Sequence, residues 1–311
     1  MAQLMKGETW SDACKLVRGQ PRFQYPVMVE AKADEIRCRV YKSGGEILFE
    51  SYAGKPLCNL AGFAVQFQLM MHHAHLTELD VGVLVNRNFN DSYRWVRSAK
   101  GFPQEKLDKG TGKVAPALTS EMVEFILFDL PESQKPFIDR LRDIDFAASG
   151  LRHYGLRCTR PARALAQTPG EVLDWYADFR SKGYEGAMAK TLDHVYARRR
   201  TYDWMKIKPS EDHDGCITGF NEAISSVDEL CPETSVVLVP KGTPLGRAGS
   251  INVRTADGST AAPAGIPHGL GRELWENQDK YIGQWVEFTC MERDRQGGFR
   301  HPIYNRFRED K

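Results

Sequence analysis

Lysines stand at the ends of regular apolar stretches of this chain, and a lysine amine can do covalent chemistry. Lys32 follows the strand-like stretch 26–31, while Lys206 and Lys208 alternate with apolar residues in the stretch 203–208. A free lysine, with a pKa of about 10.4, is almost wholly protonated at neutral pH, but burial or neighbouring cations lower that pKa and free the amine as a nucleophile. Because side chains alternate along a strand, Lys206 and Lys208 would share one face, where they could hold a phosphate and lower the pKa of Lys32.

Two further short patterns carry groups suited to binding phosphate or metal. In Ser51–Lys55 (SYAGK) the glycine permits a tight turn, from which Lys55 can reach a phosphate. In Glu185–Lys190 (EGAMAK) the glycine allows a close approach of the backbone. Taken alone, each pattern also has an ordinary structural explanation: a solvated strand end, a plain turn, or a strand that starts after a helix.

The elements that would position these groups are short strands and amphipathic helices. Alternating apolar and polar residues predict strands at 26–31 and 35–41, and a strongly apolar run predicts one at 123–130. Further short strands are expected at 46–52, 79–85, 186–190 and 203–208. Apolar residues at helical spacing predict helices at 59–75, 134–148 and 169–182. The last helix has well-marked ends, with Thr168 as N-cap, Glu171 in a capping box and Gly183 as the stop.

The texture of the sequence changes after Pro209. Short β-prone segments, separated by turns rich in Gly and Pro, follow at 214–220, 235–239, 248–254 and 284–291. They predict a small barrel or sandwich of about a hundred residues. We therefore expect two domains, 1–209 and 210–311. The segment 98–120, rich in Gly, Lys and Pro, predicts a mobile surface loop.

The composition is that of a globular protein. The 311 residues are 41% hydrophobic and 27% charged, which excludes disordered and fibrous classes, and no apolar run approaches the roughly 18 residues of a membrane helix. The N-terminus shows no secretory signal, so we expect a cytoplasmic protein. The seven cysteines are odd in number and lack CxxC spacing, which argues against a disulfide framework or a zinc site. The net charge of +1 alone does not indicate a nucleic-acid-binding protein.

In their order along the chain, the motifs resemble those of the covalent nucleotidyltransferases, the superfamily of polynucleotide ligases and mRNA capping enzymes. The resemblance is closest to small ATP-dependent DNA ligases of phage and bacterial type, and it covers nearly the whole chain. The matching segments are Glu30–Arg37 (E-x-K-x-D-G-x-R), Ser51–Lys55 (S-x-x-G-K), Phe125–Leu130 (F-x-x-F-D-L), Glu185–Lys190 (E-G-x-M-x-K), Trp204–Lys208 (W-x-K-x-K) and Arg308–Lys311 (R-x-D-K). It implies an α+β fold: a nucleotidyltransferase domain with ATP-grasp-like antiparallel sheets, then a small OB-fold β-barrel.

The resemblance implies a role for each matching side chain. Lys32 would attack the α-phosphate of ATP and carry AMP as a lysine adenylate, with Mg²⁺ neutralising the phosphates. Glu185 would bind the metal or its water shell, and Phe125 would belong to the core. The residues implied in nucleotide binding are Glu30 (adenine amino group), Arg37 (ribose), Phe128 and Met188 (the two faces of adenine), Lys206 and Lys208 (α-phosphate), and Arg308 and Lys311 (leaving pyrophosphate).

Two positions depart from the family's pattern. Glu35 stands where the first motif has glycine, and Gly82 stands where the third motif, D-G-E, has a glutamate used near the ribose and metal. Loss of activity is one interpretation. The other is that the exchange is reciprocal between neighbouring strands, so that the Glu35 carboxylate fills the space over Gly82 and serves in metal binding. This hypothesis predicts that Gly82→Glu partly rescues Glu35→Gly.

We therefore expect a monomeric ligase that seals nicks in duplex DNA, in replication, repair or recombination, through the lysine adenylate and a 5′-adenylated DNA. It would act in the cytoplasm, or in the host's cytoplasm if phage-encoded. Candidate contacts to DNA phosphates are Lys55, Arg94, Arg97 and Lys100. Two alternatives stay open. An RNA ligase or capping-type enzyme would differ in nucleotide and acceptor, and an impaired nick or end sensor would form no covalent adduct.

Overall fold

The chain divides into two compact units, Met1–Ile207 and Lys208–Lys311. The computed structural model describes residues 4–17, 19–97, 106–107, 114–115, 118–230, 237–293 and 297–310. Each unit buries apolar clusters of its own, so the two are described separately. Within these ranges, no helix is both long and apolar enough to cross a membrane.

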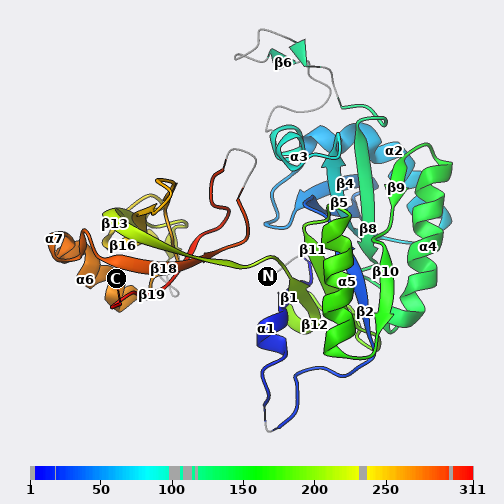
Figure 1. Cartoon of the computed structure of the whole chain (residues 1–311). Coiled ribbons are helices and arrows are strands. Elements are labelled where there is room, and N and C mark those ends of the chain that lie inside the picture. Colours follow the sequence, from blue (N-terminus) through cyan, green and yellow to red (C-terminus); the bar gives the residue numbers. More distant parts are fainter. Residues whose placement is uncertain are drawn as a thin grey trace. The chain divides into compact units, whose positions relative to one another are not determined.

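The first unit contains two five-stranded sheets (Figure 1). The sheet that carries Lys32 has the order β1 (Lys6–Thr9), β12 (Arg200–Ile207), β11 (Gly186–Thr191), β2 (Val27–Lys32) and β10 (Arg163–Ala166). Its neighbours are antiparallel except β1 and β12, which run parallel. Helix α5 (Pro169–Ser181) packs on β2 and β11, and the short α1 (Trp10–Ala13) packs on β12. Strand β2 lies between β11 and β10 and is buried along almost its whole length, which explains its apolar run VMV.

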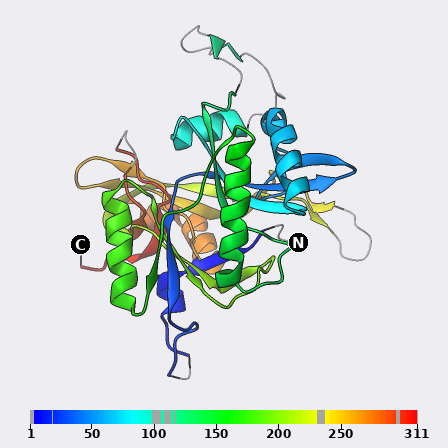
Figure 2. The same cartoon turned by 90° about the vertical axis from the view of Figure 1, so that its right-hand side faces the viewer.

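The second sheet has the order β4 (Glu46–Ser51), β3 (Ile36–Ser43), β5 (Glu78–Val85), β8 (Val123–Asp129) and β9 (Arg157–Thr159). Four helical segments accompany it: η1 (Cys58–Phe63), α2 (Ala64–His73), α3 (Phe89–Val96) and α4 (Phe137–His153). The long green helices in Figure 2 are α4 and α5. Alternate residues of β3 and the apolar residues of β5 and β8 bury against phenylalanines of η1 and α2, so this sheet has the largest core of the molecule's described part.

Local sequence explains where the helices begin and end. Thr168 caps α5, because its Oγ1 accepts from the backbone N of Glu171, and Gly183 ends it with φ +85°. The single helix expected over 59–75 is wrong in its first part, which forms the 3₁₀ helix η1 before α2 begins. Strands β9 and β10 were not predicted, since three or four residues are too few to show a period.

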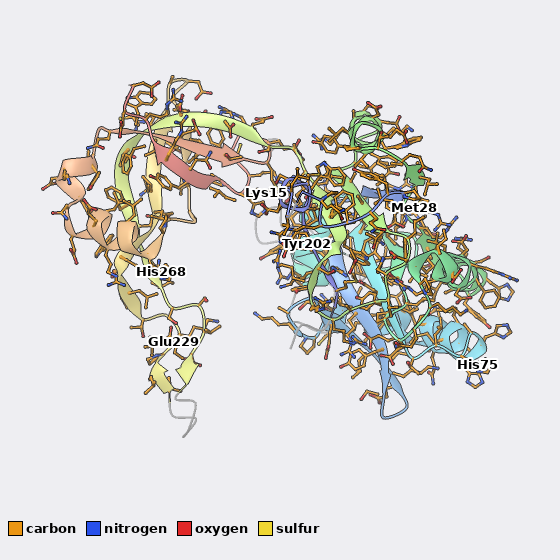
Figure 3. All side chains as sticks on the ribbon, turned by 90° about the horizontal axis from the view of Figure 1, so that it is seen from below. Lys15, Met28, His75, Tyr202, Glu229 and His268 are labelled. Atoms are coloured by element: carbon orange, nitrogen blue, oxygen red, sulfur yellow. The ribbon has the colours of Figure 1, made fainter. Side chains whose placement is uncertain are left out.

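The second unit is a five-stranded sheet with the order β17 (Thr260–Ala261), β16 (Pro244–Thr255), β13 (Glu211–Ile224), β18 (Trp285–Cys290) and β19 (Ile303–Phe307). Its ladders leave the sheet open, so the expected barrel is not closed by regular strand pairing. Isolated bridges from Ala264 to Ser250 and to Ile303 connect the two sides instead. Figure 3 marks the hairpin β14 (Glu229–Leu230) and β15 (Val237–Val239) by Glu229, and the start of α6 (His268–Glu276) by His268. Helix α7 (Gln278–Tyr281) follows α6.

The segment 98–120 falls mostly outside the described residues. The part that is described includes a short hairpin of β6 (Lys106–Leu107) and β7 (Val114–Ala115). The expectation of a mobile loop, and the candidate contact Lys100 within it, therefore lie outside what the structure describes.

Candidate active site

Lys32 ends β2 next to two carboxylates. Its cross-strand partner is Gly186 at the start of β11, which brings the preceding residue, Glu185, to its side. The Lys32 Nζ forms an ion pair with the Glu185 carboxylate, donates to the Ala33 carbonyl oxygen at 3.1 Å, and lies 3.9 Å from Glu35 Oε2. Sequence reasoning had named the segments Glu30–Arg37 and Glu185–Lys190 as separate motifs, and the β2–β11 ladder joins them.

The expected effect of lysine neighbours on Lys32 is wrong in this structure. Burial lowers the pKa of Lys32, but the carboxylates of Glu35 and Glu185 act in the opposite direction and hold the pKa above its ordinary value. The reason is geometric, because the charges that lie against the amine are negative. The structure also ends β12 at Ile207, so Lys208 lies beyond the strand, in the second unit, and the expected strand face with two lysines keeps only Lys206.

Glu35 lies over Gly82. A Cβ atom placed on Gly82 would stand 2.5 Å from Glu35 Cγ and 2.7 Å from Phe128 Cζ, so a side chain at position 82 would collide with both. The Glu35 side chain is 9% exposed, and its Oε2 has no hydrogen-bond partner. Burial raises the pKa of this carboxyl, Lys32 opposes the rise, and Glu185 adds to it. The two positions that depart from the family's pattern are therefore in direct contact.

Arg37 is held in place by a buried acid. Its Nε donates to Asp80 Oδ1 at 2.9 Å, and a second guanidinium nitrogen binds Asp80 Oδ2. Tyr196 donates its hydroxyl to the same Oδ2 at 2.7 Å, and the Arg37 guanidinium lies 5.1 Å from the Trp204 ring. Burial lowers the pKa of Arg37, and Asp80 more than offsets that. Arg37 is thus permanently charged and fixed, as a group that orients a polar ligand must be.

Glu30 is almost fully buried and pairs with Lys190, the last residue of the Glu185–Lys190 motif, to which sequence reasoning gave no role. Its Oε2 lies 2.7 Å from Lys190 Nζ, which also lies 4.1 Å from the Trp204 ring. The expected contact of Glu30 with an adenine amino group would have to share the carboxylate with Lys190. The signal was available, because Glu30 opposes Met188 in the ladder and Lys190 is then its diagonal neighbour on one face.

The aromatic and apolar side chains of the motifs divide between pocket and core. Phe125 is fully buried, edge-on to Phe63 and Phe67 at 5.4 and 5.0 Å, as a core residue should be. Phe128 is half-buried and lies against Gly82, as Glu35 does. Met188 is partly buried against the cluster that contains Trp204.

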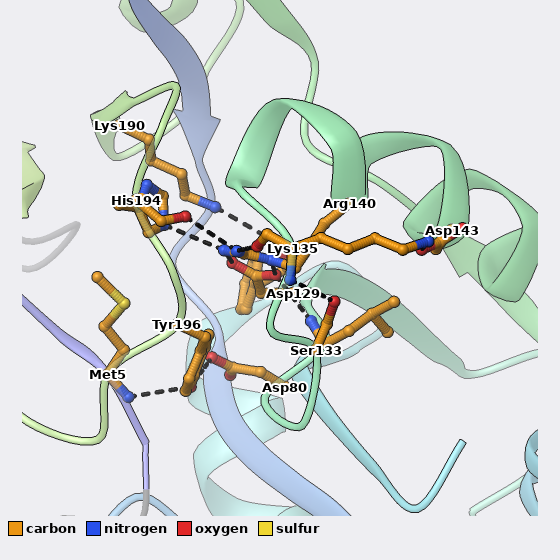
Figure 4. Close-up of polar contacts among 12 residues, drawn as sticks. Met5, Asp80, Asp129, Ser133, Lys135, Arg140, Asp143, Lys190, His194 and Tyr196 are labelled. Atoms are coloured by element: carbon orange, nitrogen blue, oxygen red, sulfur yellow. Dashed lines mark hydrogen bonds and ion pairs between the residues drawn. The ribbon is translucent and has the colours of Figure 1, made fainter. Parts of the chain in front are cut away.

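A buried polar network ties the two sheets together (Figure 4). Asp129, at the end of β8, binds Arg140 of α4 in two hydrogen bonds of 2.7 and 2.9 Å, and both side chains are wholly buried. Arg140 and Trp204 both approach His194 Nε2, at 3.2 and 2.9 Å. Burial lowers the pKa of His194 to about 4. The neutral ring therefore accepts at Nε2 and donates from Nδ1 to the Thr191 carbonyl at 2.7 Å.

Other predicted residues lie apart from Lys32 or in the second unit. Lys55 is exposed at the turn after β4, and Arg94 and Arg97 are exposed on α3. In the second unit, Lys208 Nζ lies 3.9 Å from Met291 Sδ. Arg308 is ion-paired with Asp214 and Asp310, both at 2.7 Å. Lys311 lies outside the described residues.

A second set of possible metal ligands occurs in the second unit. Donor atoms of Glu211, His213 and Cys290 lie within 4.8 Å of one another on the β13–β18 ladder. Sequence reasoning argued against a zinc site from cysteine spacing alone, which cannot detect ligands brought together by cross-strand pairing. Three donors fall short of the four that closed structural zinc sites have.

Two curated proteins that are similar in sequence to this chain are phage DNA ligases. The DNA ligase of Enterobacteria phage T3 is 25% identical over 138 residues, which is 44% of this chain and 37% of that protein. The DNA ligase of Escherichia phage T7 is 28% identical over 151 residues, 44% of this chain and 41% of that protein. The matched regions thus span less than half of the length of these relatives. No family model matches the chain.

Solved structures show the fold. A structure named Pmar-Lig_Pre superposes with a TM-score of 0.72 at 18% identity, covering 99% of this chain and 68% of that one. A Lig E DNA ligase gives 0.63 at 17% identity, and the ATP-dependent DNA ligase of bacteriophage T7 in complex with ATP gives 0.55 at 17% identity, each covering 98% of both chains. The α+β fold expected from the motifs, that of a nucleotidyltransferase domain followed by an OB domain, is confirmed, except that the described strands do not close the second unit into a barrel. The chain has the two-domain fold of the ATP-dependent DNA ligases, and it resembles in sequence the compact ligases of phages T3 and T7.

Proposed function

We propose that this protein is an ATP-dependent DNA ligase that seals nicks through an AMP adduct on Lys32. One observation carries the proposal: a largely buried lysine amine lies between the Glu35 and Glu185 carboxylates, on a chain with the ligase fold. Arg37, fixed by Asp80, and the half-buried Phe128 supply what a nucleoside needs nearby, a charged donor and an aromatic face. The nucleotidyltransferase domain would end near 207–209.

The covalent step follows from the contacts of Lys32. Its ammonium gives up a proton, for which the paired Glu185 carboxylate is the adjacent acceptor. The free amine then forms a bond to the α-phosphorus of ATP while the bond to pyrophosphate breaks. The 5′-phosphate at a nick next takes the AMP from the nitrogen, and the 3′-hydroxyl displaces AMP to form the phosphodiester. Each step is a displacement at phosphorus, so positioning and charge neutralisation dominate.

The residues around Lys32 fit a divalent cation. Glu185 and Glu35 are carboxylates, which are the ligands that Mg²⁺ takes from proteins, and Glu35 Oε2 is buried without a partner. A bound Mg²⁺ would supply charge neutralisation on the phosphates. Arg308, now paired with Asp214, and Lys206 would bind phosphate oxygens. We further propose that the protein acts as a monomer on nicked duplex DNA in the cytoplasm.

Intact-mass spectrometry tests the function directly. Protein incubated with ATP and Mg²⁺ should gain one AMP, and nicked DNA should discharge it. Lys32→Ala should gain nothing, while Lys42→Ala, a change at a lysine of β3 remote from the motifs, should behave as the wild type. GTP in place of ATP distinguishes a capping-type enzyme. Absence of any adduct would favour the nick or end sensor, to which the glycine at position 82 points.

A further inference from the structure

A buried carboxylate oxygen beside Lys32 is left unsatisfied. Glu35 Oε2 has no hydrogen-bond partner, and the Lys32 Nζ at 3.9 Å is too distant to donate to it. A charged oxygen that is buried without a hydrogen bond is destabilising. Such atoms in native structures mark a functional role, an ordered water or a bound ion.

The charges around Lys32 change when its nitrogen forms a bond to the α-phosphorus of ATP. One ammonium now stands against two carboxylates, those of Glu35 and Glu185. When the nitrogen bonds to the α-phosphorus it has lost its proton and its charge, and pyrophosphate carries away the electrons of the broken bond. Both carboxylates then lose their ion pair with Lys32. The loss of a cation beside two buried carboxylates is unfavourable, so this state favours the binding of a new positive ion.

The absence of a side chain at Gly82 leaves the space that the Glu35 side chain occupies. The backbone of Gly82 is ordinary strand, paired with Arg37 on one side and Ile126 on the other, so no left-handed conformation requires glycine. What requires it is space, since a Cβ at this position would stand 2.5 Å from Glu35 Cγ. A side chain at position 82 would thus collide with Glu35, and with Phe128 Cζ at 2.7 Å as well.

We propose that Glu35 and Glu185 form a divalent-cation site beside the Lys32 nitrogen, and that Gly82 makes the room for Glu35 to complete it. The site binds the cation more tightly once Lys32 has lost its positive charge. Only this last statement rests on the proposed function, because it takes Lys32 as the adenylated residue. A merely structural Glu35, serving as an ion-pair partner of Lys32, would bind no cation.

Binding of Mn²⁺, followed by the loss of the free-ion signal in electron paramagnetic resonance, tests the site without any nucleotide. Lys32→Met removes the ammonium and should bind Mn²⁺ at least tenfold more tightly than the AMP-free wild type. Adding Glu35→Gln to that variant should weaken binding at least tenfold, whereas adding Glu46→Gln, at an exposed position of the β3–β4 hairpin, should not. Equal Mn²⁺ affinity with and without Glu35→Gln would overturn the proposal.

The rate of AMP adduct formation tests the reciprocity of positions 35 and 82. Glu35→Gly should slow the adduct about 10²–10³-fold, as loss of a preorganised charged group does. Glu35→Gly combined with Gly82→Glu should recover to within about tenfold of wild type, because the second carboxylate then enters the vacated space. A double variant no faster than Glu35→Gly, while folded by its thermal transition, would contradict the proposal.

The two measurements separate this inference from the proposed function. If the wild type forms no adduct with any nucleotide but Glu35→Gln still weakens Mn²⁺ binding, the ligase proposal fails and the cation site stands. If the wild type forms the adduct and Glu35→Gln changes neither Mn²⁺ binding nor the adduct rate, the ligase proposal stands and the cation site is wrong.

Discussion

Glu30 and Lys190 form a buried ion pair in the sheet that carries Lys32. Both side chains are at most 5% exposed and lie 2.7 Å apart. Breaking such a pair from one side leaves an uncompensated buried charge, while replacing both partners removes the problem. The pair therefore contributes little net stability, but the loss of one partner alone is strongly destabilising.

Lys190→Met should lower the free energy of unfolding by about 3–5 kcal/mol, because Glu30 then stays buried without a cation. Adding Glu30→Gln should restore much of that loss. Lys182→Met is the matched control, since its pair with Asp178 is exposed and its loss should cost less than about 1 kcal/mol. Urea unfolding of the four proteins measures these differences, and equal losses at Lys190 and Lys182 would refute the argument.

For single residues, the sequence predicted which residue types come together but not the direction of their pKa shifts. Motif order identified Lys32 and Glu185, and the β2–β11 ladder puts them together. The direction of the Lys32 pKa was wrong, because it depends on which charges lie within a few ångströms after folding. Neither Lys190 nor Asp80 was singled out, although each binds a residue that was.

The segment 194–198 lies between β11 and β12. Its side chains form hydrogen bonds that connect the two sheets of the first unit. Its alternate residues reach across: His194 to Arg140, Tyr196 to Asp80 and Arg198 to Glu78. An extended connection turns every second side chain to the same side. The segment thereby connects strand β12, which carries Trp204, to the sheet in which β3 carries Arg37 and β8 carries Phe128.

The His194 link makes the stability of this junction depend on pH. In the folded protein the pKa of His194 is lowered to about 4, and in the unfolded chain it returns to about 6.5. The unfolded state therefore binds the extra proton first as pH falls. Stability that is fully present above pH 6.5 should be lost progressively down to pH 4, by up to about 3 kcal/mol.

Chemical denaturation at pH 7 and pH 5 measures this loss. His194→Gln, whose amide oxygen can still accept from Trp204, has no such titration and should show a smaller difference between the two pH values. The same difference in both proteins would show that other groups cause the pH dependence.

Sequence periodicity was informative for long elements and silent on short ones. Strands such as β5 and β8 were predicted within a residue or so because six or more residues display a pattern. The segment 194–198 has no regular structure to predict, and its contacts become visible only when two sheets are in place. Helix α3, which carries the candidate DNA contact Arg94, was not among the predicted helices.

For the whole molecule, the division into two units distributes the candidate functional groups unequally. Lys32, its carboxylates, Arg37 and Phe128 belong to the first unit, and Arg308 belongs to the second. Arg308 is engaged there by Asp214 and Asp310. To act on pyrophosphate, as we propose, it has to exchange those partners for phosphate oxygens.

Arg308→Ala should therefore slow formation of the Lys32 adduct about 10²-fold and leave the sealing of pre-adenylated nicked DNA within about threefold, since only the first step releases pyrophosphate. Arg306→Ala is the control, because that exposed arginine pairs with Glu287 and is assigned no role. Quenched-flow assays of the two steps make the comparison. Equal slowing of both steps would argue against a role confined to pyrophosphate.

The exposed basic residues Lys55, Arg94 and Arg97 should contribute to DNA affinity through phosphates. Each single change to alanine should reduce the slope of log affinity against log salt by about 0.9, without altering the rate of adduct formation. Lys182 at the C-cap of α5 is paired with Asp178, and Lys182→Ala should leave the slope unchanged. Fluorescence anisotropy with a nicked duplex at several salt concentrations provides the slopes, and an unchanged slope at all three residues would remove them from the interface.

The contact between Glu35 and Gly82 also limits how such a protein can change over generations. Starting from the pattern that the motifs resemble, with glycine at position 35 and glutamate at position 82, gaining Glu35 first would make two side chains collide, because a Cβ at position 82 stands 2.5 Å from Glu35 Cγ. Losing the second glutamate first would leave the pocket without its carboxylate. Either order passes through a poor intermediate, so a lineage that has crossed will seldom return by single substitutions.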